Sequence, residues 1–207
     1  MNYLINNINE IFSLTITHIY IVFLSTMPSA ILGIILGIIF SRKKFIKFGK
    51  IVLLISGILQ SIPSIAFIAI FFVYTGIGIK TSVLALFLYS IVPVIYNTSS
   101  SLIMVPEEIL EAARGMGFNK KEILLKVEIP LSLKGILSGI RTSLTINVAT
   151  ATVATVIGVD TLGKIILIGL RVRKIDMLFT GGLIVALLAI IFDYILEKIE
   201  NMVLKWA

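Results

Sequence analysis

The sequence predicts an all-α integral membrane protein with about five transmembrane helices, organised as one domain over residues 1–207. Hydrophobic residues make up 58% of the chain, only 14% of the residues are charged, and the mean hydropathy is +1.09. Soluble domains carry about 25% charged residues. The apolar residues are gathered in blocks close to the length of about 20 residues that crosses a bilayer as a helix. No internal repeat, linker or low-complexity segment divides the chain.

The apolar blocks give the expected spans in chain order: residues 16–40, 51–74, 81–104, 136–159 and 177–196. Each block is long enough to cross about 30 Å of hydrocarbon as a helix. Pro63 and Pro93 lie within the second and third blocks, where a proline can kink the helix. Residues 160–176, between the last two spans, mix apolar and basic residues and predict a short interfacial or re-entrant helix.

The positions of the basic residues predict the orientation in the membrane. Thirteen of the 18 lysines and arginines fall on one side, namely after the first and third spans, at the inner end of the fourth and in the C-terminal tail. Basic residues are enriched on the cytoplasmic side, so we expect the N-terminus outside and the C-terminus inside a cell (cytoplasmic or inner) membrane. The same distribution accounts for the basic isoelectric point, so we expect no nucleic-acid binding.

Few titratable residues are available for catalysis or metal binding. The chain has no cysteine and one histidine, His18, which we expect at the interface near the outer end of the first span. Zinc sites and Ser-His-Asp catalysis both require more partners than this. Asp193, the clear acid within a span, is expected to pair with Arg141 or Lys198, or simply to lie near the cytosolic interface. We therefore expect no enzymatic activity, metal or cofactor on this chain.

A charged segment, residues 105–135, interrupts the apolar chain on the expected cytosolic side. Its centre reads EAARGMGFNKKEILLKVEIP. Pro106 followed by two glutamates predicts the first turn of a helix, with the proline at the first helical position. Apolar residues then recur at helical spacing on one face: Ile109, Ala112, Ala113 and Met116. Gly115 and Gly117 predict the end of this helix.

A second short helix is expected to follow within the charged segment. Asn119 with Glu122 three residues later predicts a capping box. The helix should run to about Glu128 and end at Pro130. On these local signals alone, the charged segment fits an ordinary surface loop or a docking surface whose small alanines let a partner approach closely.

The spacing within the charged segment resembles the EAA loop of permease subunits of bacterial ABC importers. That loop reads Glu-Ala-Ala, three residues, glycine, nine residues and an Ile-x-Leu-Pro-like end. The residues that fall on this spacing are Glu111, Ala112, Ala113, Gly117 and Pro130. Val127 and Ile129 replace the usual isoleucine and leucine. The resemblance implies a cytosolic coupling loop that docks into a groove of an ATPase and transmits its closure to the spans.

Three further stretches resemble the subfamily that imports glycine betaine, choline and carnitine. They are QSIPSIAFIAI (60–70), GIGIKTSVLALFLYSIVPVIYNT (76–98) and GIRTSLTINVATATVATVIG (139–158). The resemblance implies the type I ABC importer permease fold and inward movement of a quaternary-amine osmoprotectant. An amino-acid importer permease of the methionine type is the alternative. At GVDTLG, Asp160 and Thr161 stand where the family usually has small residues.

The resemblance also implies a set of partners. The chain has no Walker A motif, so ATP and Mg²⁺ are expected on a separate cytosolic ATPase dimer. About five spans are too few to enclose a route, so we expect a homodimer or a heterodimer with a similar permease in the lipid bilayer. An extracellular or periplasmic binding protein should select the solute. An ion channel is the rival of a different class and would conduct without ATP.

An importer needs a route lined by polar or small residues, and three of the expected spans supply them. The candidate route residues are Gln60, Pro63, Asn97, Ser143, Asn147 and Thr150. Small and hydroxyl residues also let membrane helices pack closely, so packing is the alternative for each of them. The three amides are the stronger candidates, because an unpartnered amide is costly in lipid.

Overall fold

The computed structural model describes residues 2–42 and 44–205, and regular structure in these residues is helical. The helices are α1 (Asn2–Asn6), α2 (Ile8–Ser41), α3 (Ile46–Ser61), α4 (Ser64–Thr75), α5 (Ile79–Ile103), α6 (Glu107–Gly115), α7 (Lys120–Ile123), α8 (Ile129–Thr150), α9 (Gly163–Arg171) and α10 (Ile175–Leu204). A wide π-type turn, η1 (Leu124–Glu128), joins α7 to α8, and a tight 3₁₀ turn, η2 (Val153–Ile157), follows α8.

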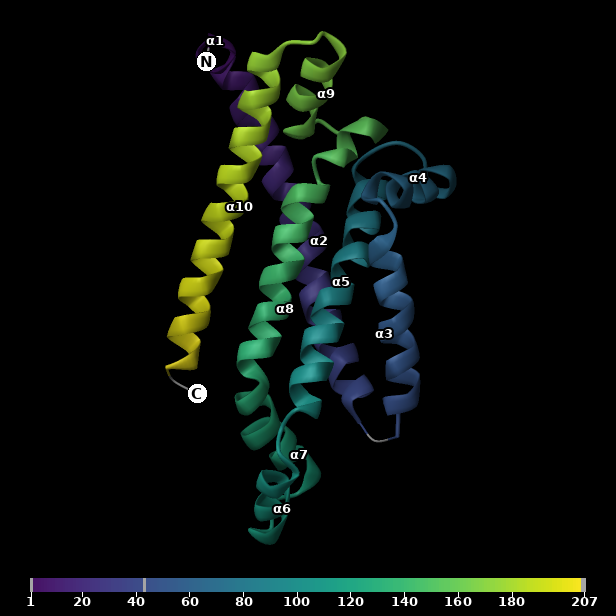
Figure 1. Cartoon of the computed structure of the whole chain (residues 1–207), viewed down its shortest axis with the longest axis vertical. Helices are drawn as coiled ribbons and strands as arrows, with labels where there is room; N and C mark the ends of the chain where they lie inside the picture. Colours follow the sequence, from purple (N-terminus) through teal and green to yellow (C-terminus); the bar gives the residue numbers. More distant parts are fainter. Residues whose placement is uncertain (1, 43, 206–207) are drawn as a thin grey trace.

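The long helices form an elongated bundle (Figure 1). Helix α5 packs against both α2 and α8, and α10 packs against α8 and α9. Helices α6 and α7 project beyond one end of the bundle, whereas α4 and α9 lie at the other end. The N-terminus lies at the α9 end, and α10 runs from there toward the α6 end, which agrees with the alternation of sides expected from the basic residues.

Within the described residues, α2, α5 and α10 are long and apolar enough to cross a membrane. Helix α8 has 22 residues, so it is about 33 Å long and runs beside α5. The first and fifth expected spans lie within the longer helices α2 and α10. These helices continue past the apolar blocks because hydropathy marks only the part suited to hydrocarbon, whereas the helical backbone can extend into water.

The second expected span is wrong as a single helix. It is divided into α3 and α4 at Pro63, which adopts an extended conformation with φ −53° and ψ 131°. Proline has no N–H to continue the ladder, and it disfavours the helical conformation at the residue before it. Pro93, by contrast, remains inside α5 and is buried there.

The fourth expected span is also displaced. Helix α8 begins at Ile129 and ends at Thr150, whereas the apolar block predicted residues 136–159. Beyond α8 the chain tightens into η2 and then turns at Gly158, which has a φ of +81°. The short helix expected within residues 160–176 is confirmed as α9.

Glycines bring the central helices into close contact. A Cβ added at Gly33 would lie 2.6 Å from the Cβ of Val94, and one added at Gly37 would lie 2.6 Å from the Cβ of Thr98. On the other side of α5, a Cβ at Gly139 of α8 would lie 2.9 Å from an α5 atom. Small residues at such crossings let membrane helices approach closely, so α2, α5 and α8 form the core of the fold.

His18 lies inside the bundle, and its expected position at the level of the membrane interface stays a prediction. Its side chain is fully buried, and Nε2 lies 3.0 Å from the backbone oxygen of Val148, so this nitrogen donates the hydrogen bond. The contact joins α2 to α8 across 130 residues of sequence. Burial of His18 depends on this distant helix, which the local sequence does not identify.

Candidate functional site

Helix α6 forms the projecting part of the charged segment, and its start is set by local sequence. Pro106 caps it from the position just before the first helical residue, one place earlier than expected. Glu107 and Glu108 lie in the first turn, where carboxylates interact favourably with the helix dipole. Arg114 in the last turn donates to Glu107 at 2.9 Å. Helix α6 is thus supported at both ends by its own charges.

The expected glycine stop after α6 is confirmed. The helix ends at Gly115, and Gly117 follows with a φ of +86°. The N–H of Phe118 donates to the Ala113 oxygen at 3.1 Å, and that of Gly117 donates to the Arg114 oxygen at 2.9 Å. This pair of bonds is a Schellman motif, which satisfies carbonyls that the helix end leaves free.

The capping box at the start of α7 is also confirmed. Asn119 Oδ1 accepts from the N–H groups of Lys121 and Glu122, both at 3.0 Å, and the Asn119 N–H donates to Glu122 Oε2 at 3.0 Å. The hydrogen bond from Asn119, followed by the contact with Lys126, lowers the pKa of Glu122 below its ordinary value. The corner between α6 and α7 is therefore fixed by hydrogen bonds on both sides.

Pro130 does not end the second helix, so that expectation is wrong. The chain continues from α7 through η1 directly into α8, and Pro130 lies in the first turn of α8. The N–H of Ile129 donates to the Leu124 oxygen five residues back. This wider turn accommodates the proline ring, which would otherwise clash with the carbonyl four residues before it. The charged segment is thus continuous with a long bundle helix.

The expected apolar face of α6 is divided between the interior and the surface. Ala113 is only 1% exposed and packs in a small cluster with other buried residues of this end, which are Val105, Leu110 and Ile123. Ile109 and Met116 are 41% and 68% exposed, and Ala112 is also exposed. Of the two alanines expected to meet a partner, only Ala112 is accessible. We call Ile109, Glu111, Ala112 and Met116 the α6 outer face.

The five residues on the EAA spacing differ in their exposure and in their position along the charged segment. Glu111, Ala112 and Gly117 are exposed on the projecting part, whereas Ala113 is buried beneath it. Pro130 is half-buried at the base, where α8 begins. Their docking role remains a prediction, and the geometry places three of them where a cytosolic partner can reach them.

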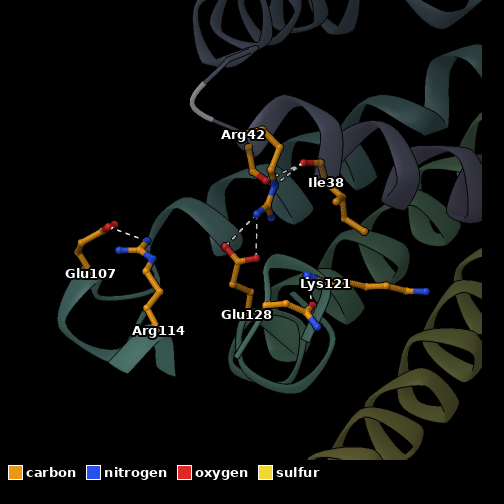
Figure 2. A network of polar contacts seen from close by, with 8 residues as sticks. Ile38, Arg42, Glu107, Arg114, Lys121 and Glu128 are labelled. Atoms are coloured by element: carbon orange, nitrogen blue, oxygen red, sulfur yellow. Dashed lines mark hydrogen bonds and ion pairs between the residues drawn. The ribbon is translucent and has the colours of Figure 1, made fainter. Parts of the chain in front are cut away.

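An ion pair that the sequence did not reveal ties the charged segment to α2. Arg42 Nη1 donates to both carboxylate oxygens of Glu128, at 3.0 and 2.8 Å (Figure 2). Arg42 Nε also donates to the backbone oxygen of Ile38 at 3.2 Å. In the sequence, Arg42 is one of the basic residues after the first expected span, and no local pattern relates it to a glutamate 86 residues away.

A groove of about 650 Å³ separates the projecting helices from the ends of α2 and α5. Its charged lining comes from both sides: Arg42, Glu107, Arg114, Lys120, Lys121 and Glu128. The remaining lining is mostly isoleucine, leucine and valine from the ends of α2, α3 and α5 and from the projecting segment between Val105 and Leu124. The projecting helices are therefore held partly away from the bundle, and the Arg42–Glu128 pair joins the two sides.

The candidate route residues on α8 lie inside the single chain. Ser143 and Asn147 are fully buried and Thr150 nearly so. Asn147 Nδ2 donates to Ser25 Oγ at 3.0 Å and to Thr26 Oγ1 at 2.8 Å, both on α2. This amide contact joins α8 to α2, as the packing alternative requires, and a role in the route stays a prediction.

The other candidate route residues are spread over α3, α4 and α5. Gln60 is half-buried, and its backbone oxygen accepts from the Tyr89 hydroxyl at 3.2 Å. Pro63 is exposed at the break between α3 and α4. Asn97 is half-buried and donates to the Pro93 oxygen at 2.8 Å within its own helix. The structure does not gather these residues with those of α8 into one site.

The expected pairing of Asp193 is confirmed, and the contacts of Asp160 and Thr161 are new. Asp193 pairs with Arg141, as one of its expected partners, through a 2.6 Å contact between Oδ2 and Nη2 that links α10 to α8. At the other end of the molecule, Asp160 pairs with Lys164 at 2.9 Å, and Thr161 is buried and donates to the Ala151 oxygen at the end of α8 at 3.0 Å.

Known proteins resemble the chain over nearly its whole length. The osmoprotectant import permease protein OsmW of Salmonella typhimurium is 35% identical over 205 residues, covering 97% of this chain and 94% of that protein. The glycine betaine/carnitine/choline transport system permease protein OpuCB of Bacillus subtilis is 35% identical, covering 98% and 93%. The choline transport system permease protein OpuBB of the same organism is 33% identical, covering 97% and 92%.

Solved structures share the fold at low sequence identity. The MetNI methionine ABC transporter, in an inward-facing crystal form, superimposes with a TM-score of 0.80 at 20% identity, covering 93% of this chain and 95% of the other. An amino acid ABC transporter gives a TM-score of 0.74 at 17% identity, covering 99% and 97%. Residues 31–205 match the family described as "Binding-protein-dependent transport system inner membrane component". The chain therefore belongs to this family of inner-membrane permeases and has the type I ABC importer permease fold.

Proposed function

We propose that this chain is the permease subunit that moves glycine betaine, choline, carnitine or a related quaternary-amine osmoprotectant into the cell, powered by a separate ATPase. The observation that carries the coupling to an ATPase is the projecting helix α6. It is joined by a hydrogen-bonded corner to α7, which continues through η1 into α8, and it exposes Glu111 and Ala112 beyond the bundle. A partner that moves α6 can therefore move a bundle helix.

Sequence similarity supports the choice of solute. The relatives described above are named for osmoprotectants, choline, carnitine or glycine betaine, and they match almost end to end at 33–35% identity. The methionine transporter has only 20% identity and shares the fold, so it gives no support to the methionine alternative. A quaternary amine is therefore the proposed cargo class.

We infer a division of labour between this chain and its partner subunits. In the glycine-containing stretch GIGIK, residues 76–78 connect α4 to α5 at the end of the bundle away from α6, and Ile79 and Lys80 begin α5. This stretch does not join a strand to a helix, as a Walker A loop does. We assign ATP and Mg²⁺ to a cytosolic ATPase dimer and solute selection to an extracellular or periplasmic binding protein.

The proposed route lies between two permease copies, in a homodimer or a heterodimer with a similar chain. Within one copy, the candidate route residues are buried between helices or spread among them, as described above. The opposite side of α8 leaves Thr142 and Thr145 exposed, each donating to its own helix backbone. A second copy facing such a surface would complete a polar route inside the bilayer.

Transport by the reconstituted complex tests the proposal. Proteoliposomes containing this chain, its ATPase and its binding protein should accumulate labelled glycine betaine, choline or carnitine only when ATP is supplied on the ATPase side. Methionine serves as the matched competitor. Stimulation of ATP hydrolysis by methionine alone would contradict the quaternary-amine assignment. Solute flux without ATP would contradict an importer and support the channel alternative.

A further inference from the structure

The Arg42–Glu128 ion pair connects the end of α2 to η1, the wide turn that leads from the projecting helices into α8 (Figure 2). Both carboxylate oxygens accept from the same guanidinium nitrogen, at 3.0 and 2.8 Å. The Glu128 side chain is 9% exposed, whereas that of Arg42 is 36% exposed. The glutamate is thus withdrawn from water and depends on this arginine for its charge partner.

The Arg42 end of the contact is anchored in the bundle. Arg42 is the residue that caps α2, and its Nε donates to the Ile38 oxygen at 3.2 Å, which fixes the guanidinium against the last turn. That turn follows Gly37, where α2 and α5 are so close that a Cβ would lie 2.6 Å from Thr98. Arg42 therefore attaches Glu128 to a part of α2 that is held in place by close packing against α5.

The Glu128 end belongs to the part that a partner would move. Glu128 lies in η1, and Ile123 of the adjoining α7 packs in the buried cluster with Leu110 and Ala113 of α6. A displacement of α6 would therefore be passed through this cluster to α7 and η1. At η1 the chain continues covalently into α8 and is joined by the ion pair to α2.

Other ion pairs of the charged segment differ from this one in exposure. In the Glu107–Arg114 pair the side chains are 47% and 50% exposed, and in the Glu122–Lys126 pair they are 36% and 59% exposed. Exposed pairs contribute little, because water and salt screen them. Removing one partner of a buried pair leaves an uncompensated charge and is much more disruptive.

We propose that Arg42 and Glu128 are positioning residues that hold η1 against α2, so that movement of α6 by the ATPase is transmitted to α2 as well as to α8. The proposal rests on the proposed function, since it assumes that an ATPase acts on α6. Without the ion pair, η1 can move relative to α2, and fewer solute molecules are transported for each ATP hydrolysed. The ratio of solute transported to ATP hydrolysed is therefore the diagnostic quantity.

Charge substitutions in the reconstituted complex test the proposal. We expect Glu128→Gln and Arg42→Gln each to lower the ratio of solute transported to ATP hydrolysed by about threefold or more, within the range of known coupling effects. The double exchange Arg42→Glu with Glu128→Arg should recover at least part of the ratio, because it restores the pair. Lys126→Gln, which removes only an exposed pair, is the matched control and should retain the wild-type ratio.

Hydrogen exchange provides a second readout that does not depend on the solute. In the purified chain, Glu128→Gln should increase exchange at η1 and α7 and leave the centre of α5 unchanged. Unaltered transport ratios and unaltered exchange in both single variants would overturn the inference. If the wild-type complex transports no quaternary amine, the proposed function fails. If the wild-type complex transports it and both variants keep the wild-type ratio and the wild-type exchange, only the role of the ion pair is refuted.

Discussion

Gly117 holds the corner between α6 and α7 in a left-handed conformation, with φ +86°. A Cβ at this position would meet no atom within 4 Å, so the requirement for glycine is set by the backbone and not by space. The same corner carries the Schellman bonds to α6 and the capping box of α7. A single residue therefore determines the direction in which α6 projects.

Gly117→Ala should destabilise this corner by about 1–2 kcal/mol, the cost of a left-handed conformation for a residue with a Cβ. Amide exchange at Phe118, whose N–H bonds to the Ala113 oxygen, should become faster, and transport should fall while membrane insertion is retained. Gly115→Ala is the matched control, because its Cβ also meets nothing within 4 Å and its backbone is helical. Equal effects of the two substitutions would contradict a conformational role.

Glu122 makes the capping box sensitive to acid. Its folded-state pKa is lowered, first by the hydrogen bond from Asn119 and then by Lys126, so its stabilising contribution is complete above the ordinary value near 4.5. The contribution is lost as the pH falls through the lower folded-state pKa. Protection of the Asn119 amide should therefore be constant from neutral pH to about pH 5 and decline in stronger acid.

Glu122→Gln tests this assignment, because glutamine can still cap the helix but does not titrate in this range. Protection of the Asn119 amide in this variant should change little between neutral pH and pH 3, after correction for the intrinsic exchange rate. A wild-type decline already at neutral pH, or the same acid decline in the variant, would show that another group is responsible.

At the scale of elements, glycines bring α2 and α5 into close contact. Gly37→Ala would place a Cβ 2.6 Å from the Cβ of Thr98, so the helices must separate. Overpacking of this kind costs about 1–3 kcal/mol. Thermal unfolding of the detergent-solubilised protein should occur at a lower temperature.

Gly57→Ala in α3 is the control for Gly37→Ala, because a Cβ there meets nothing within 4 Å. It should retain or slightly raise the unfolding temperature, since alanine favours a helix over glycine. If both variants unfold at the same lowered temperature, close approach of α2 and α5 does not explain the requirement for glycine at position 37.

Elements that depend on neighbours in sequence could be predicted, and those that depend on distant partners could not. The glycine stop after α6 and the capping box at Asn119 are each formed by residues within one or two helical turns. The local sequence therefore contains every residue that takes part in the interaction. The division of the α6 apolar face depends on the cluster that covers Ala113. His18 and the Arg42–Glu128 pair need helices 130 and 86 residues away.

Helix boundaries illustrate a related limit. Pro63 and Pro130 each carry the same local signal, yet one separates α3 from α4 and the other lies in the first turn of α8. The difference is that η1 widens before Pro130 and makes room for its ring, whereas the chain turns at Pro63. A proline prevents the regular helical hydrogen bond at its position. The packing around it determines whether the helix breaks, as at Pro63, or widens before the proline, as at Pro130.

At the scale of the whole molecule, the two ends of the bundle carry different elements. The α6 end carries the exposed projection and its link to α2, and the α9 end carries α4, η2 and the Asp160 turn. The fold class was predictable from the apolar blocks, and the EAA spacing located the projecting segment, whose docking role stays a prediction. The contacts of Asn147 in α8 with α2 could not be predicted, because they depend on how distant helices pack.

Thiol crosslinking of the α6 outer face is the most direct test of the central claim that the charged segment docks an ATPase. The natural chain has no cysteine, so Ala112→Cys introduces a unique thiol at an exposed position. In membranes containing the assembled transporter, a short bifunctional reagent should join it to a nucleotide-binding subunit, identified by mass spectrometry. Ala113→Cys, buried beneath it, should react far less, and Asp160→Cys at the other end should give no such product. A nucleotide-binding subunit captured from position 160 and not from position 112 would contradict the claim.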